Sequence, residues 1–150
     1  MSLLPSFARL LQRNALSTER QQLVITREES RLRKLEQQLS ELEQLCRALE
    51  KGIQGLYTTG YTSRSELFTQ QRKQAALRRR LKDSEARILQ LQTDITQCQQ
   101  RCVAARQQWQ QLLRQGKKYQ QVYQQKKRTR DVKRILTNER DMEEQTTWKR

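Results

Sequence analysis

The sequence is poor both in residues that interrupt helices and in residues that build compact cores. Its 150 residues include one proline, Pro5, and four glycines, Gly52, Gly55, Gly60 and Gly116. Because proline and glycine are the residues that most disfavour helix interiors, helix is the expected structure almost everywhere. Only 34% of the residues are hydrophobic and 5% are aromatic, too few for a compact globule of this length. The composition therefore indicates an elongated helical protein.

Residues typical of an active site are also missing. The chain has no histidine, and the glycines of residues 52–60 lack the Lys-Ser/Thr ending of a phosphate-binding loop. Cys46, Cys98 and Cys102 are an odd set without the paired spacings of a disulfide framework. Cys98 and Cys102 are four residues apart, but a closed zinc site would need carboxylates to complete it, so we interpret all three as core residues. We expect no enzyme, no cofactor and no metal.

The chain has no apolar run near the roughly 20 residues that span a bilayer. Residues 1–16 carry an arginine inside their apolar patch, unlike a signal peptide, so we expect a cytoplasmic protein. The formal charge is +15 and it is uneven: residues 101–150 carry 14 basic and 5 acidic side chains, whereas residues 21–56 carry six of each. This excess favours an acidic partner, which nucleic acid, anionic lipid or an acidic protein surface would each satisfy.

Two stripes of mainly apolar residues recur at alternating steps of three and four, the pattern of a coiled coil. The first stripe consists of Leu32, Leu35, Leu39, Leu42, Cys46, Leu49, Ile53 and Leu56. The second stripe consists of Leu67, Leu77, Leu81, Ile88, Leu91, Ile95, Cys98, Cys102, Ala105, Trp109, Leu112, Gly116, Tyr119 and Tyr123, and polar Gln70, Gln74 and Ser84 interrupt it. Extended backwards to Leu4, the first stripe crosses Asn14, Thr18, Gln21 and Glu28, which predicts a looser terminal half.

Turn residues cluster between the stripes, where Ser63 and Glu66 have capping-box spacing. The predicted fold is all-α: a long two-helix antiparallel coiled-coil hairpin with the second helix overhanging. We expect a single domain over 1–150, with helix 1 at about 3–57, a turn at about 58–64, helix 2 at about 65–145 and a frayed tail. A reversal near residue 61 would place Leu35 against Ile88 and Phe7 against Gly116. The same rule would place Asn14 against Trp109, Gln21 against Cys102 and Glu28 against Ile95.

Basic and polar residues follow one another in a distinctive order after the turn. They are Ser65-Glu66-Leu67, Arg72-Lys73-Gln74, Arg78-Arg79, Lys82-Asp83, Tyr119-Gln120 and Gln125-Lys126-Lys127-Arg128. Over about residues 60–135 this order resembles the second helix of the InvI/SctO proteins of bacterial type III secretion, and the hairpin resembles the related YscO and FliJ proteins. The resemblance implies a non-enzymatic central stalk, peripheral to the inner-membrane export apparatus, that promotes ATPase assembly, ATPase activity and protein export.

The resemblance also implies partners for the two ends of the hairpin: the hexameric secretion ATPase, the nonameric cytoplasmic ring of the export gate and, as further partners, export chaperones. With the charge excess, it predicts ATPase binding by Leu4, Phe7, Arg9, Arg13, Lys126, Lys127, Arg128, Arg130, Lys133 and Arg134. It predicts export-gate binding by Leu49, Ile53, Tyr57, Tyr61, Leu67 and Phe68.

Other interpretations stay open at this point. The aromatic residues near the turn can pack together and merely close it. The whole chain can be a structural coiled-coil scaffold that oligomerises through its exposed face, or a basic coiled coil that binds nucleic acid.

Overall fold

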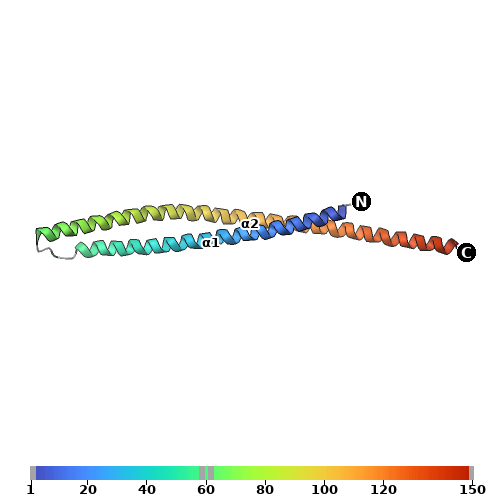
Figure 1. Ribbon diagram of the computed structural model, residues 1–150, viewed down its shortest axis with the longest axis horizontal. Helices are drawn as coiled ribbons and strands as arrows, with labels where there is room; N and C mark the ends of the chain where they lie inside the picture. The colour runs from blue at the N-terminus through green and yellow to red at the C-terminus, as the bar shows by residue number, and fades with distance from the viewer. Residues whose placement is uncertain (1–2, 58–59, 61–62, 149–150) are drawn as a thin grey trace. The chain divides into compact units, whose positions relative to one another are not determined.

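A computed structural model of the chain describes residues 3–57, 60 and 63–148. Two helices make up the fold: α1, Leu3–Tyr57, and α2, Arg64–Trp148 (Figure 1). They pack against each other in opposite directions, so the prediction of an all-α antiparallel coiled-coil hairpin with an overhanging second helix is confirmed. Helix α2 continues through Trp148, beyond its expected end at about residue 145.

The chain forms two compact units. Unit 1 comprises Met1–Val24 and Ala105–Arg150, and unit 2 comprises Ile25–Ala104. Each unit takes one segment from each helix, so each contains its own antiparallel helix pair. The single hairpin domain stays a prediction.

Helix α2 begins at a side-chain cap. The backbone N–H of Glu66 donates a hydrogen bond to Oγ of Ser63 at 3.3 Å, and the N–H of Leu67 donates to the Ser63 carbonyl at 3.1 Å. A serine hydroxyl in this position satisfies an N–H group that has no partner within the helix, and the Glu66 carboxylate lies at the positive end of the helix dipole. The start of α2 therefore follows from local sequence.

The core of unit 2 lies along the seam, the interface where the two stripes pack. Its buried apolar residues are Cys46, Leu49, Leu91, Ile95, Cys98 and Cys102. All six occupy positions of the two predicted stripes, and Leu91 and Cys98 are fully buried. Burial raises the pKa of the Cys46 thiol, and the nearby carboxylates of Glu85, Glu50 and Glu43 raise it further. Since both effects favour the neutral thiol, Cys46 behaves as a small apolar core residue.

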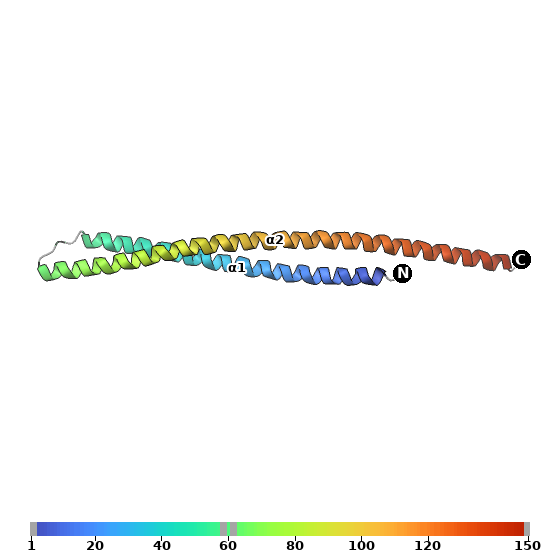
Figure 2. The same ribbon diagram turned by 90° about the horizontal axis from the view of Figure 1, so that it is seen from above.

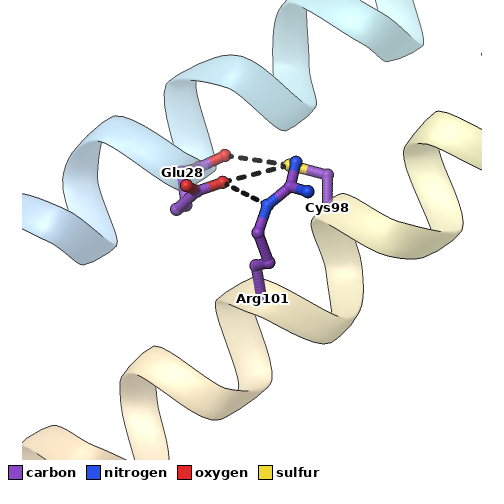
Figure 3. Close-up of polar contacts among 3 residues, drawn as sticks. All are labelled: Glu28, Cys98 and Arg101. Atoms are coloured by element: carbon purple, nitrogen blue, oxygen red, sulfur yellow. Dashed lines mark hydrogen bonds and ion pairs between the residues drawn. The ribbon is translucent and has the colours of Figure 1, made fainter.

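The polar stripe residue Glu28 is accommodated in unit 2 by partners on α2 (Figure 3). Sγ of Cys98 donates to the Glu28 carbonyl at 3.5 Å and approaches its carboxylate at 3.6 Å. Nε of Arg101 lies 3.3 Å from the same carboxylate, and this hydrogen bond raises the pKa of the Arg101 guanidinium. The carboxylate thus enters the seam with a cation beside it instead of as an isolated charge.

In unit 1, two polar stripe residues reach across to the backbone of α2. Nδ2 of Asn14 donates to the Leu112 carbonyl at 2.9 Å, and Nε2 of Gln21 donates to the Ala105 carbonyl at 3.0 Å. A Cβ atom at Gly116 would overlap the side-chain oxygen of Asn14, so the glycine makes room for this amide. The polar positions are therefore hydrogen-bonded across the seam.

These contacts show that the predicted register was wrong by one stripe position. Asn14 bonds to Leu112 instead of meeting Trp109, Gln21 bonds to Ala105 instead of meeting Cys102, and Glu28 meets Cys98 instead of Ile95. Gly116, predicted to face Phe7, contacts Asn14, two stripe positions away. The prediction assumed a symmetric reversal near residue 61.

The physical reason lies in the connection between the helices. Helix α1 ends at Tyr57 and α2 begins at Arg64. Residues 58–63 lie outside both helices, so the symmetric rule, which counts every residue as helical at about 1.5 Å, does not fix the register. The start of α2 lies beyond the end of α1 (Figure 1), which agrees with the exposure of Leu67, a stripe residue near that start.

We predict that Leu91→Ala lowers the free energy of unfolding by about 2–5 kcal/mol, because it leaves a cavity at a fully buried position. Leu89→Ala is the matched control: Leu89 is 66% exposed on the same helix, and its loss should stay within about 0.5 kcal/mol. Urea denaturation followed by circular dichroism measures both. Equal losses of unfolding free energy in the two variants would contradict the burial of Leu91 in the seam.

A second prediction concerns Gly116 and Asn14. Replacing a helical glycine with alanine normally stabilises a helix by about 1 kcal/mol. At Gly116 the gain should vanish, because the new methyl group displaces the Asn14 amide from its bond to the Leu112 carbonyl.

In an Asn14→Ala background the same change should recover the gain, giving a coupling of at least about 0.5 kcal/mol in a double-mutant cycle. Gly55→Ala is the control, since a Cβ there meets nothing within 4 Å. If Gly116→Ala had the same effect with and without Asn14, the contact would carry no energy.

Candidate protein-binding surfaces

The first candidate surface, here called the terminal surface, lies in unit 1 and combines the start of α1 with the basic stretch 126–134 of α2. Nζ of Lys126 lies 4.8 Å from the centroid of the Phe7 ring, a cation–π contact between residues far apart in the sequence. Both residues are half-buried. The structure thus brings two predicted ATPase-binding residues together.

Beyond Lys126, α2 continues as an overhang, residues 127–148, with no described part of α1 beside it (Figures 1 and 2). Its first turns carry exposed Lys127, Arg128, Arg130, Lys133 and Arg134. At 3.6 residues per turn, Lys127, Arg130, Lys133 and Arg134 lie within about one third of the helix circumference, whereas Arg128 lies on the opposite side. An ion pair of 3.6 Å joins Arg130 to Asp131, but both side chains are about half exposed, so solvent screens it.

The remaining predicted residues of this surface lie on α1. Arg9 and Arg13 are exposed and add positive charge to unit 1, whereas Leu4 is half-buried at a stripe position. Leu4 and Phe7 therefore contribute mainly to helix packing, and the basic side chains are the part of the surface open to a partner.

The second candidate surface, here called the hairpin surface, lies in unit 2 near the connection and consists of Tyr57, Leu67, Phe68 and Arg78. Tyr57 and Phe68 are 58% and 59% exposed, and Leu67 is also exposed. The Arg78 guanidinium lies 5.8 Å from the centroid of the Tyr57 ring, and its Nη2 donates a hydrogen bond to the Tyr57 hydroxyl. Arg78 thus holds one aromatic ring in place while most of that ring faces solvent.

The other predicted gate-binding residues lie differently. Leu49 is buried in the seam and Ile53 is half-buried, so both support the surface from beneath. Tyr61 lies outside the residues that the structure describes. Sequence reasoning gave Arg78 no role, because its contact with Tyr57 depends on the register of the two helices, and no local motif reports it.

Two further observations concern the hydropathy of the helices and the similarity of the chain to known proteins. Within residues 3–57 and 63–148, neither helix has a segment long and apolar enough to cross a membrane. No curated protein and no solved structure matches the chain. A family model described as "Salmonella surface presentation of antigen gene type M protein" matches residues 6–146, which includes nearly all of both helices.

This match confirms the resemblance to the InvI/SctO proteins, and it extends well beyond residues 60–135, where the sequence order was distinctive. The chain therefore belongs to the Salmonella surface presentation of antigen gene type M family, and is a protein of a type III secretion system.

Proposed function

We propose that the protein is a non-enzymatic central stalk of the type III secretion export apparatus, acting at the cytoplasmic side of the inner membrane. Family membership places it in this secretion system, and the basic overhang of α2 is the observation that carries the finer proposal. In this proposal the terminal surface docks in the hexameric secretion ATPase and promotes its assembly and activity. The hairpin surface contacts the cytoplasmic ring of the export gate, and export chaperones are further partners.

The shape and charge of the overhang support ATPase docking. A single helix, with its side chains, is roughly 10–12 Å wide and can enter the central opening of a protein ring. Five of the six basic residues of 126–134 lie within about one third of the helix circumference, and Arg128 lies on the opposite side. Acidic groups around such an opening would attract this concentrated positive charge. A protruding, strongly basic helix therefore fits an opening lined with acidic groups.

Exposed aromatic residues support a second contact at the hairpin surface. Tyr57 and Phe68 leave more than half of their area open, although large aromatic side chains usually gain stability by burial. Aromatic residues together with an arginine are the types enriched at energetically important interface positions. Tyr57, Phe68 and Arg78 offer that combination within one unit.

For the terminal surface, we predict that Arg130→Glu, Lys133→Glu and Arg134→Glu together raise the concentration needed for half-maximal ATPase stimulation by at least about tenfold. Three reversed charges at an electrostatic interface are worth more than about 1.4 kcal/mol, the equivalent of one factor of ten. Phosphate release by the purified ATPase, titrated with each variant, measures the effect.

The matched control reverses Arg31, Arg33 and Lys34, three exposed basic residues of unit 2, and changes net charge by the same amount. For this control, the concentration needed for half-maximal ATPase stimulation should stay within about threefold of the wild-type value. Unchanged stimulation by the overhang variant, or equal losses in both, would remove the terminal surface from the ATPase contact.

At the hairpin surface, Tyr57→Ala with Phe68→Ala should weaken binding to the cytoplasmic domain of the export gate by at least about tenfold, because the variant removes two aromatic anchors. Biolayer interferometry with the immobilised gate domain measures the affinity. Leu89→Ala is the control, since Leu89 is an equally exposed apolar residue of unit 2. Undiminished binding combined with a lower melting temperature would show that the aromatic residues only close the turn.

A further inference from the structure

The overhang carries an apolar face that neither proposed contact uses. Val132, Ile135 and Leu136 are 55%, 57% and 51% exposed, and all three follow Lys126, which contacts Phe7 near the start of the described part of α1. Their spacing of three and four places them on neighbouring positions of one helix side. Apolar side chains grouped in this way on an otherwise charged helix indicate a contact surface.

This face is separate from the seam. Continuing the second stripe past Tyr123 leads to Lys126, Arg130, Lys133 and Thr137, which are basic or polar. At 3.6 residues per turn, the side that carries Val132 and Ile135 lies roughly half a turn away from these positions. The apolar face is therefore not an unused continuation of the α1 contact, and it requires a different partner.

Charge along the overhang changes sign around this face. Residues 126–134 contain six basic side chains and Asp131, whereas residues 139–144 contain four acidic side chains and Arg140. Apart from Lys126 and Asp131, which are half-buried, these side chains are exposed. The helix is thus positive before the apolar residues and negative after them. A partner that runs in the opposite direction with the same charge order would complement both parts.

A second copy of this chain meets that requirement. One helix side carries Arg128, Val132, Ile135 and Glu139 in steps of four, three and four. This order of steps is the same from either end, so a second copy running in the opposite direction presents its residues at matching positions. In an antiparallel pair, Arg128 of each copy therefore faces Glu139 of the other, and Val132 faces Ile135 twice.

A parallel pair would instead place Arg128 against Arg128 and Glu139 against Glu139, and the like charges in each of these contacts would repel each other. An anionic lipid surface would attract residues 126–134 but repel the acidic residues 139–144 on the same helix. We propose that the overhang pairs with the overhang of a second copy as an antiparallel, two-fold symmetric helix pair, centred between Val132 and Ile135.

This pairing has a consequence that rests on the proposed function. Arg128 belongs both to the terminal surface and to the self-pairing face, so a paired overhang cannot also enter the ATPase. The pair is then a resting form, and the ATPase competes with it for the overhang.

Sedimentation equilibrium of the full chain, without ATPase, tests the pairing. The wild type should show a reversible monomer–dimer equilibrium that weakens as salt rises, because salt screens the Arg128–Glu139 pairs. Arg128→Glu and Glu139→Arg should each weaken dimerisation by at least about tenfold, because each change affects both symmetric pairs. The double variant, which exchanges the two charges, should return to within about threefold of the wild type. Arg130→Glu, on the other side of the helix, is the control and should leave the dimer intact.

A wild-type chain that stays monomeric to millimolar concentration would overturn the proposal. So would a dimer that survives Ile135→Asp, or charge reversals that the double variant does not rescue. Monomers that cosediment with vesicles of anionic phospholipid would assign the face to a membrane surface instead. The ATPase titration alters Arg130, Lys133 and Arg134, which lie off this face. Either proposal can therefore fail without changing the result expected for the other.

Discussion

Each helix of this fold has a single helical neighbour, so each can bury only one stripe of its surface. That constraint governs the rest of the structure. The buried residues of unit 2 lie at stripe positions on both helices, and the outward sides are mainly polar or charged. With so few buried side chains, every stripe position matters. Leu91 is fully buried, whereas Leu89, two residues earlier on the same helix, is almost two-thirds exposed.

Polar residues at stripe positions are compatible with this constraint because they find partners across the seam. Asn14 and Gln21 donate to backbone carbonyls of α2, and Glu28 accepts from Cys98 and Arg101. A buried polar group without a partner would cost roughly 1–3 kcal/mol, so these bonds favour one register over a slipped one. Two described side chains are exceptions, because the indole N–H of Trp109 and Oε1 of Gln70 are buried without a hydrogen-bond partner. The looser terminal half expected from the polar positions stays a prediction, although Asn14, Gln21 and Glu28 each have a hydrogen-bond partner across the seam.

The sequence predicted helix positions and stripes well because both depend on local spacing. Ser63 and Glu66 mark the start of α2 through a bond only three residues long, and Cys46, Leu49 and Leu91 recur at coiled-coil intervals. Register could not be predicted in the same way. Register depends on where α2 begins, at Arg64, relative to the end of α1 at Tyr57, and no heptad pattern encodes this offset.

The wrong register led directly to errors in predicted contacts between the helices. Phe7 was paired with Gly116, but it lies under Lys126, and the contact of Arg78 with Tyr57 was missed.

A two-helix fold also limits where function can reside. The seam uses the apolar residues that pack well, and a partner can contact only what the seam leaves exposed. In unit 2 the exposed side chains near the connection include Tyr57 and Phe68, which lie next to the last stripe residues of α1 and the first of α2. In unit 1 the overhang of α2 extends past the described part of α1, so side chains on every side of this helix segment, around its whole circumference, are exposed.

On that circumference the positions in line with the seam are basic, and the apolar residues lie on the opposite side. If the overhang evolved only to extend the coiled coil, its apolar residues would follow the seam, because that is where α1 packs. Their displacement by half a turn is best explained by a partner other than α1. A helix that is basic on one side and apolar on the other can present different contacts to two partners in turn, and a shared residue such as Arg128 makes those contacts compete.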